Sequence, residues 1–333
     1  KASEVILANI RRSFGDRAGL IARIESFTQD SGLPLSLKNF IGYYHLDPRS
    51  IYGKFSFSRL CADAGVRDDF IEPAESILTK AFSKLVAVDS RRWIKFLTDI
   101  LPRFSCELAA SLSDFEKRML QMFYITVFQE AADWRSHTTQ ANMQLLADSP
   151  IMMHELNELL SFNLERIDFI DQPVPLGFDC PLDLHCTYTR DQILIAMDYM
   201  TPKNVREGVK WLPDKQVDVF FITLNKADKD YSPTTMYNDY SINESLFHWQ
   251  SQSTTSDTAG TGQRYINHRQ RGSKVVLFVR EFKQDSIGAA PYTCLGTAAY
   301  VKHTGSKPMN ITWHLDQPIP AKYLRKTNKL VVG

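Results

Sequence analysis

The stretch Asp168-Phe-Ile-Asp-Gln-Pro-Val-Pro-Leu-Gly-Phe-Asp-Cys-Pro181 divides the chain into two parts of different character. Its prolines and its glycine interrupt helical periodicity, as turn and boundary segments do. Before it, apolar residues recur at three- and four-residue spacing, which is typical of helices. After it, short β-type runs lie between turn residues. The pattern predicts an α+β chain, with an all-helical domain at residues 1–170 and a mixed β-sheet or barrel domain at residues 171–333.

The individual elements follow from the same periodicities. In the second domain, Thr189 and Gln192 have the spacing of a capping box that opens a helix at Asp191–Met200. Residues 254–262 form a polar run that we expect to be a loop. The helices predicted in the first domain are Ser3–Phe14, Ala18–Gln29, Ser36–His45, Ser56–Ala64, Pro73–Ala87, Arg91–Leu101, Asp114–Gln129, Gln140–Ala147 and Ile151–Phe162. The strands predicted in the second are Val217–Asn225, Ser245–Ser251, Lys274–Phe282, Tyr292–His303, Met309–Leu315 and Lys329–Val332.

Charge is distributed unevenly along the 333 residues, although the net charge is only +1. Residues 1–200 carry 21 Lys and Arg against 27 Asp and Glu, a balance of −6. Residues 201–333 carry 18 against 11, a balance of +7. Such a separation creates a directional field that favours a polyanionic partner at the basic end. The alternative is a basic face that contacts only solvent.

Cysteine content and hydropathy indicate the cellular setting. The five cysteines are odd in number and widely spaced, in a chain too long to need disulfide staples. No apolar run approaches the roughly 20 residues of a membrane helix. We therefore expect a cytoplasmic protein without membrane partners. The chain begins at Lys1 in helical sequence, so we also expect it to be a piece of a longer protein.

Most enzymatic chemistries find no support in the sequence. There is no Gly-x-x-x-x-Gly-Lys-Ser/Thr loop and no Gly-x-Ser-x-Gly elbow. Cys180, His185 and Cys186 lie close together, but no second pair at ligand spacing completes a zinc site. His248, His303 and His314 lie in strand-like runs without a carboxylate partner at a fixed spacing. We therefore predict no catalytic residue, no metal and no cofactor for this part of the protein.

An aromatic and amide-rich segment, residues 231–252, is the best candidate site. Aromatic rings can enclose a base that has been flipped out of a duplex, and stacking at roughly 1–3 kcal/mol per base offsets the cost of unstacking. The candidate walls are Tyr237, Tyr240 and Trp249. Asp239, with Asn238 or Gln250, could supply the acceptor and donors that a cytosine edge requires. The alternative is that Tyr240 and Trp249 belong to the core and that the polar residues cap turns.

A basic segment follows the aromatic one. Its side chains could contact the flanking phosphates in a salt-sensitive and sequence-independent manner. The residues predicted for this role are Arg264, His268, Arg269, Arg271 and Lys274.

The ordered motifs of the second half resemble a known bacterial domain. They are Tyr-Ser-Pro-Thr-Thr-Met-Tyr-Asn-Asp-Tyr-Ser-Ile-Asn (231–243), Leu-Phe-His-Trp-Gln-Ser-Gln (246–252), Gly-Gln-Arg-Tyr-Ile-Asn-His (262–268), Val-Leu-Phe-Val-Arg-Glu (276–281), Tyr-Thr-Cys-Leu-Gly (292–296) and Met-Asn-Ile-Thr-Trp (309–313). The resemblance is to the C-terminal part of SauUSI-like modification-dependent type IV restriction enzymes, and it extends over the whole chain.

This resemblance implies a helical coupler followed by an SRA-like (PUA-like) domain that senses 5-methylcytosine or 5-hydroxymethylcytosine in double-stranded DNA. It places a phospholipase-D-like nuclease and a superfamily 2 helicase, with its ATP and Mg²⁺, upstream in the same chain. The chain would then be the sensor of an ATP-dependent endonuclease that acts against foreign DNA. The alternative is a protein–protein assembly module, with the aromatic residues in the core and the helices forming a homodimer.

Overall fold

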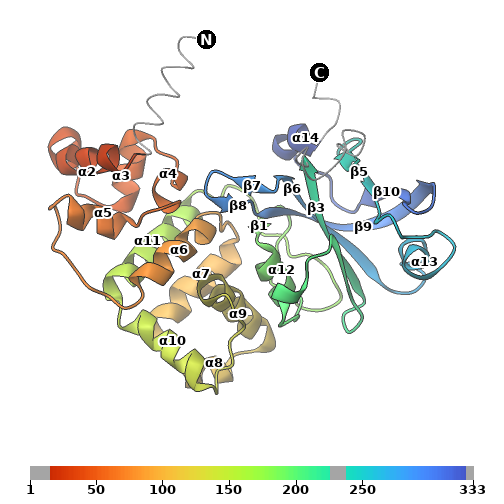
Figure 1. The fold of residues 1–333 in the computed structure, drawn as a ribbon, viewed down its shortest axis with the longest axis horizontal. Coiled ribbons are helices and arrows are strands. Elements are labelled where there is room, and N and C mark those ends of the chain that lie inside the picture. The colour runs from red at the N-terminus through yellow and green to blue at the C-terminus, as the bar shows by residue number, and fades with distance from the viewer. Residues whose placement is uncertain (1–15, 226–237, 328–333) are drawn as a thin grey trace, which may run out of the picture. The chain divides into compact units, whose positions relative to one another are not determined.

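The computed structural model describes residues 16–225 and 238–327, and the chain forms two compact units (Figure 1). One unit comprises residues 1–169 together with 286–288, and the other comprises 170–285 and 289–333. The first is helical and the second is built around a mixed sheet, which confirms the predicted α+β class. None of the described helices is long and apolar enough to cross a bilayer.

The helical unit follows the predicted periodicity closely. Its central helix is α9 (Asp114–Phe128), in which every residue from 118 to 127 is buried, so no side of these turns faces solvent. The predicted helix Ser3–Phe14 lies outside the described residues. The other helices are α2 (Arg17–Ser31), α3 (Leu37–Tyr44), α4 (Arg49–Tyr52), α5 (Phe57–Asp63), α6 (Glu75–Leu85), α7 (Arg91–Ile100), η1 (Leu101–Arg103), α8 (Cys106–Ser111), α10 (His137–Ala147) and α11 (Pro150–Glu165).

Helix starts in this unit are fixed by side-chain caps. A serine hydroxyl accepts a backbone N–H in the first turn of most of these helices, which satisfies a donor that has no partner inside the helix. In α9 this becomes a full capping box between Ser113 and Glu116. The capping serines are Ser36, Ser56, Ser90, Ser105, Ser113 and Ser136.

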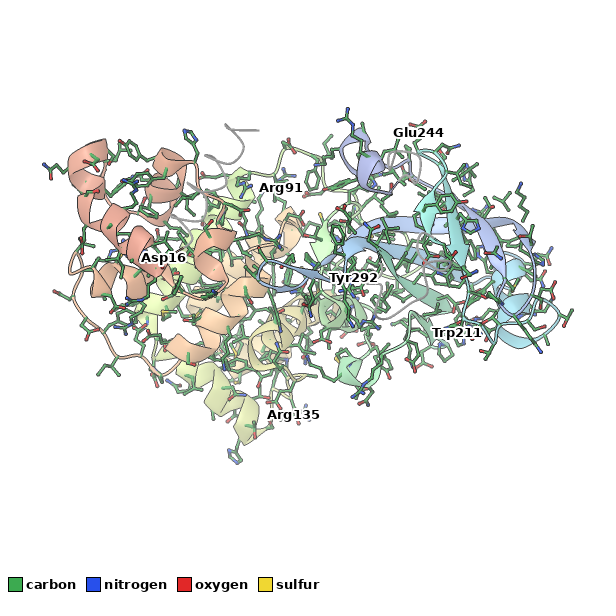
Figure 2. All side chains as sticks on the ribbon, turned by 45° about the horizontal axis from the view of Figure 1, so that its top comes forward. Asp16, Arg91, Arg135, Trp211, Glu244 and Tyr292 are labelled. Atoms are coloured by element: carbon green, nitrogen blue, oxygen red, sulfur yellow. The ribbon has the colours of Figure 1, made fainter. Side chains whose placement is uncertain are left out.

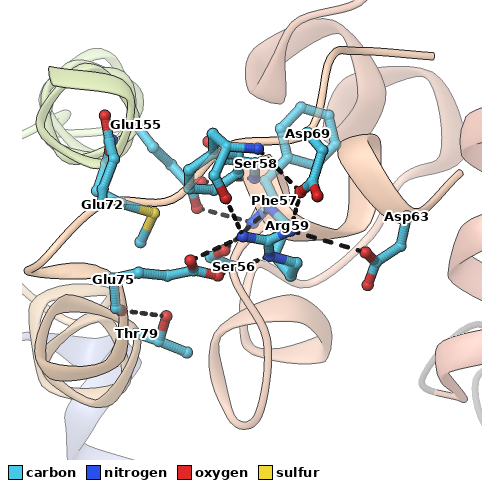
Figure 3. Close-up of polar contacts among 12 residues, drawn as sticks. Ser56, Phe57, Ser58, Arg59, Asp63, Asp69, Glu72, Glu75, Thr79 and Glu155 are labelled. Carbon is cyan, nitrogen blue, oxygen red and sulfur yellow. Dashed lines mark hydrogen bonds and ion pairs between the residues drawn. The ribbon is translucent and has the colours of Figure 1, made fainter. Parts of the chain in front are cut away.

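Carboxylates distant in sequence complete the capping (Figure 3). Glu155 of α11, which is 1% exposed, accepts the backbone N–H groups of Phe57 and Ser58 at 2.8 and 2.6 Å. These are the first two residues of α5. Glu72 in turn accepts the N–H groups of Ile151 and Met152 in the first turn of α11. Each carboxylate therefore holds a helix end against a segment that lies far away in the chain.

The second unit contains an eight-stranded sheet in the order β2-β3-β6-β9-β10-β5-β4, with β1 paired to β9. All pairs are antiparallel except β3 with β6. The strands are β1 (Thr187–Tyr188), β2 (Val209–Leu212), β3 (Val217–Asn225), β4 (Tyr240–Ser241), β5 (Leu246–Gln250), β6 (Lys274–Phe282), β9 (Tyr292–Thr304) and β10 (Asn310–Leu315). A separate hairpin comprises β7 (Gln284–Asp285) and β8 (Gly288–Ala289), and the helical elements are α12 (Arg190–Ala196), η2 (Pro202–Asn204), α13 (Gly260–Ile266) and α14 (Ala321–Thr327).

The longer predicted strands are confirmed within one residue at each end, and the capping box of Thr189 and Gln192 is present at the start of α12. The short strands β1, β2 and β4 were not predicted, because two to four residues carry too little periodicity. Helix α13 begins inside the predicted loop 254–262, and its fully buried Tyr265 packs into the hydrophobic core of the unit. The predicted strand Lys329–Val332 lies outside the described residues.

Strand β9 has two shifts of pairing register, one opposite β6 and one opposite β10. The register shifts opposite Leu277/Phe278 of β6 and opposite Thr312/Trp313 of β10. Bulges of this kind bend a strand and increase its twist. The first part of β9 therefore pairs with β1 and β6, and the last part pairs with β10, as its long curved path shows (Figure 1).

One face of the sheet carries the hydrophobic core of the unit. We call Phe220, Trp249, Tyr265 and Trp313 the aromatic core; each is at most 5% exposed. Trp249 stacks on Phe220 at 4.3 Å between ring centroids, and Tyr265 meets Phe220 edge to face at 5.5 Å. Offset and edge-to-face contacts are the favoured arrangements of aromatic rings.

Candidate functional site

Trp249 does not line a binding site, and this corrects the prediction for it. It is 5% exposed and lies inside the aromatic core. Its neighbours Phe247 and Phe220 are fully buried. A ring in this position could meet a base only by leaving the core, which would cost the free energy of its burial. The core alternative therefore holds for Trp249. The other predicted wall, Tyr237, lies outside the described residues.

Tyr240 is half-buried, and its ring stacks on a neighbouring side chain of the sheet. It pairs across the ladder with His248 of β5, and the two rings stack at 4.8 Å with an angle of 16° between their planes. Both side chains are half-buried. The Nδ1 atom of His248 lies 2.6 Å from the carbonyl oxygen of Asn238. A carbonyl can only accept, so Nδ1 carries the proton and, in the neutral ring, Nε2 is the acceptor.

Asp239 and Gln250 are linked to each other. The Oδ1 atom of Asp239 accepts the backbone N–H of Gln250 at 2.8 Å, and the Asp239 side chain is buried. This bond extends the pairing of β4 with β5, so at least one carboxylate oxygen has a structural role. The Gln250 amide donates to Oδ1 of Asn310 on β10 at 3.3 Å. The two amides therefore lie side by side on the sheet.

The strand registers bring these residues into one surface. Residues directly opposite each other on antiparallel strands point to the same face. His248 lies opposite both Tyr240 and Thr312, and Thr312 lies opposite Lys302 of β9. Together with Gln250 and Asn310 they form what we call the polar sheet face, on the side away from the aromatic core. It consists of Tyr240, His248, Gln250, Lys302, Asn310 and Thr312.

This arrangement offers a flat aromatic stack flanked by amide groups and one exposed ammonium group, whereas Thr312 is buried. Such groups can stack on a planar ligand and bond to its edge. Lys302, His248 and Thr312 were not among the predicted site residues. The alternation in Leu246–Gln250 would have separated His248 and Gln250 from Phe247 and Trp249, but alternation alone does not tell which face is covered.

Arg264 does not contact phosphate, because it is held in a buried ion pair. Its Nε and Nη2 atoms donate to the two oxygens of Asp218 at 2.8 and 2.9 Å. The Asp218 side chain is fully buried, while that of Arg264 is 18% exposed. The guanidinium also lies 4.4 Å above the ring of Trp211, which is labelled in Figure 2. The predicted phosphate role of Arg264 is therefore wrong in this conformation.

His268 is likewise a structural residue. It is 3% exposed; its Nδ1 atom lies 3.2 Å from the carbonyl oxygen of Ser273, and its Nε2 accepts the backbone N–H of Tyr300 at 3.1 Å. Both ring nitrogens are used by the neutral form with the proton on Nδ1. Burial lowers the pKa of His268 below its ordinary value, which favours the same neutral form. The prediction of a phosphate contact at His268 is corrected accordingly.

The remaining predicted cations lie nearer to the surface. Arg269 is exposed and pairs with Asp316 at 3.1 Å. Arg271 is exposed and Lys274 is half-buried at the start of β6. The phosphate contacts expected of these three residues stay a prediction.

His303 has the carboxylate partner that sequence spacing could not supply. Its Nε2 lies 3.1 Å from Oδ2 of Asp257, and its Nδ1 lies 2.5 Å from the hydroxyl of Tyr300. The Asp257 backbone N–H also donates to the hydroxyl of Ser306. The bond from His303 lowers the pKa of Asp257 below its ordinary value. These contacts tie the loop before α13 to the turn between β9 and β10.

The cysteines and histidine considered for zinc do not form a metal site. Cys180 and Cys186 are buried, and the Cys180 thiol lies 3.8 Å from the carbonyl oxygen of Ala196. Burial lowers the pKa of His185 to about 4. Across the described residues, no group of three or more His, Cys, Asp or Glu side chains has a metal-binding arrangement.

Comparison with known families gives one match. A family model described as a domain of unknown function (DUF3427) matches residues 182–326, which include the whole eight-stranded sheet and all but the last residue of α14. No curated protein is similar enough to the chain to be matched.

Proposed function

We propose that the chain recognises 5-methylcytosine or 5-hydroxymethylcytosine in double-stranded DNA by base flipping, with the polar sheet face as its reading surface. The observation that carries the proposal is the stack of Tyr240 on His248, half-exposed and next to the amides of Gln250 and Asn310. A flipped base needs an aromatic platform and hydrogen-bonding groups at its edge.

Three further features support this proposal. The second half of the chain carries the excess of positive charge. Lys302 of the polar sheet face is exposed, and Arg271 lies on the exposed turn before β6. The motif resemblance to SauUSI-like enzymes covers the same unit. In this proposal the unit has an SRA-like fold, and the helical unit couples it to an upstream helicase and nuclease of a cytoplasmic defence enzyme.

The contacts suggest how the reading would work. A base stacked on Tyr240 would meet the amides of Gln250 and Asn310, which can turn to offer either a donor or an acceptor. Asp239 would act through the β4–β5 pairing that it stabilises, because its Oδ1 already accepts the Gln250 N–H. Base-dependent affinity would come from stacking, and Lys302 and Arg271 would add a salt-sensitive contribution.

The proposal is tested by the affinity of the 333-residue chain for duplexes that differ only in one 5-methylcytosine, at about 0.15 M salt to reduce non-specific binding. We expect tighter binding of the modified duplex. Tyr240→Ala should weaken it by about 1–3 kcal/mol, or roughly 5- to 150-fold. Tyr43→Ala, at a 42% exposed tyrosine of the helical unit, is the matched control and should have no effect. Equal affinity for both duplexes in several sequence contexts would refute the sensor.

A second candidate function, protein assembly, is favoured by a different observation. The helical unit has an open and mainly apolar cleft lined in part by Phe70, and Ile71, the next residue in the chain, is 97% exposed. Exposed apolar clefts of this kind often bind protein partners. If assembly is the function, Ile71→Asp should abolish self-association in sedimentation experiments, and Tyr240→Ala should not. The cleft is lined by Ser58, Arg67, Asp68, Phe70, Pro150, Ile151 and His154.

A further inference from the structure

Two arginines contact Tyr292, the first residue of β9, which is labelled in Figure 2. The first is Arg190, the first residue of α12. Its Nη1 donates to the carbonyl oxygen of Glu207 at 2.7 Å, and its Nη2 donates to the Tyr292 hydroxyl at 3.3 Å. The guanidinium lies 4.4 Å from the ring centroid of Phe221. Neutral groups therefore fix the position of this cation.

The second arginine approaches the same tyrosine from β6. The Arg280 guanidinium lies 4.3 Å from the ring centroid of Tyr292. Its Nε donates to the hydroxyl of Thr223 at 2.9 Å, and its Nη1 donates to the carbonyl oxygen of Ala290 at 3.1 Å. Thr223 and Arg280 lie side by side on the parallel strands β3 and β6. Tyr292 thus orients both guanidinium groups, one through its ring and one through its hydroxyl.

Among the described residues, no counterion balances the two charges. Among residues 16–225 and 238–327, no carboxylate lies within 4.0 Å of either guanidinium, whereas Arg264 has Asp218 at 2.8 Å. The carboxylate of Glu207 is exposed; backbone hydrogen bonds of Glu207 and Arg206 lower its pKa most, and the charge of Arg190 lowers it least. Burial, together with the charge of Arg190, lowers the pKa of Arg280 below its ordinary value. Half-buried cations held together without an anion are costly, and a bound anion would remove that cost.

Each guanidinium group has N–H donors that remain for such an anion among the described residues. Arg190 uses Nη1 and Nη2, and Arg280 uses Nε and Nη1. Within the part of the chain that the structure describes, Nε of Arg190 and Nη2 of Arg280 have no partner. Guanidinium groups bind phosphate through paired N–H donors in a fixed plane, which favours arginine over lysine for this ligand.

We propose that Arg190 and Arg280, oriented by Tyr292, form a binding site for a phosphate group. The site lies on the same face of the sheet as Phe221 and Tyr292, and it shares no residue with the polar sheet face. It goes beyond the proposed function, because it would exist whether or not the chain reads a modified base. The phosphate can come from the backbone of a nucleic acid or from a free phosphate compound, and both share the same chemistry.

The first arm of the test uses inorganic phosphate and the 333-residue chain. Phosphate should raise the thermal midpoint by roughly 2–6 °C at about tenfold excess over its dissociation constant, compared with chloride at equal ionic strength. The rise should disappear in Arg190→Gln and in Arg280→Gln. It should persist in Arg103→Gln, at an exposed arginine paired with Asp99. Arg280→Lys keeps the charge and replaces the glutamine variants if these do not fold. It should reduce the phosphate-dependent rise of the thermal midpoint.

The second arm identifies the source of the phosphate. Affinity for an unmodified duplex is measured at several salt concentrations. If the site holds a backbone phosphate, the slope of log K against log salt should decrease by about 0.9 in each arginine variant and not in Arg103→Gln. If it holds a free phosphate compound, only the first arm should respond.

The two arms together can overturn the proposal. The phosphate site is refuted if phosphate leaves the wild-type midpoint unchanged and no arginine variant changes the salt slope. The use of an unmodified duplex keeps this result separate from the sensor proposal, which concerns the difference between modified and unmodified DNA.

Discussion

The ion pair between Arg264 and Asp218 allows a quantitative prediction. Asp218 is fully buried in β3, and burial raises its pKa although Arg264 acts in the opposite direction. Arg264→Leu would leave this carboxylate without its cation. An uncompensated buried carboxylate is expected to take up a proton in the folded state.

The cost of that proton can be calculated from the ordinary pKa of 3.8. At pH 7, protonation costs about 1.36 kcal/mol for each of the roughly 3.2 pH units above this value, which is about 4.4 kcal/mol. This agrees with the 3–5 kcal/mol usually lost when one partner of a buried pair is removed. At pH 5 the same cost is about 1.6 kcal/mol. The destabilisation by Arg264→Leu should therefore shrink by up to about 2.7 kcal/mol between pH 7 and pH 5.

The sign follows from proton linkage. Asp218 in the variant is protonated when folded and ionised when unfolded, so the folded state binds more protons. Its stability relative to wild type therefore rises as the pH falls toward 3.8. Urea denaturation of wild type and variant at pH 5, 6 and 7 gives the comparison. Arg269→Leu, at an exposed arginine paired with Asp316, should cost no more than about 1 kcal/mol at any pH.

A double variant separates the charge from the packing. Asp218→Leu combined with Arg264→Leu removes both charges, and such replacements are often neutral or stabilising. It should recover most of the stability at pH 7 and lose the pH dependence. The reasoning is wrong if Arg264→Leu costs less than about 1 kcal/mol at pH 7, or if its cost is the same at pH 5.

Three further predictions concern side chains whose roles the structure separates. Trp249→Ala should lower the free energy of unfolding, measured by urea denaturation, by about 3–5 kcal/mol, because it leaves a cavity in the aromatic core. A loss below about 1 kcal/mol would contradict the placement of Trp249 in the core. Tyr265→Phe should leave stability unchanged or raise it by up to about 1–2 kcal/mol, since the buried hydroxyl has no partner among the described residues; a clear loss would reveal one. Glu155→Gln should cost about 1–3 kcal/mol at pH 7, because its amide NH₂ would face a backbone N–H. Burial raises the pKa of Glu155 above 4.5, so wild type should lose stability as the pH rises above that value, and the variant should lack this contribution in a pH series.

Much of the fold could be predicted because the strongest signals are local. The long strands β3 and β6 begin and end where alternation and turn residues predict, and the caps at Ser113 and Thr189 depend on side chains only three residues away. The candidate site could be predicted only in part. Tyr240 lies on the surface and Trp249 in the core, although both belong to the same aromatic segment.

The sequence by itself determined the division into a helical and a β-rich part, the main elements, and the basic character of the second half. These features depend on composition and on neighbours within one or two turns. Only the tertiary structure decided which side chains meet. Asp218 and Arg264 form an ion pair across 46 residues, and Arg190 shares Tyr292 with Arg280. Such pairs depend on strand order, register and the face that helices cover. A local pattern contains no information on these, because a strand of alternating residues is compatible with either face being buried.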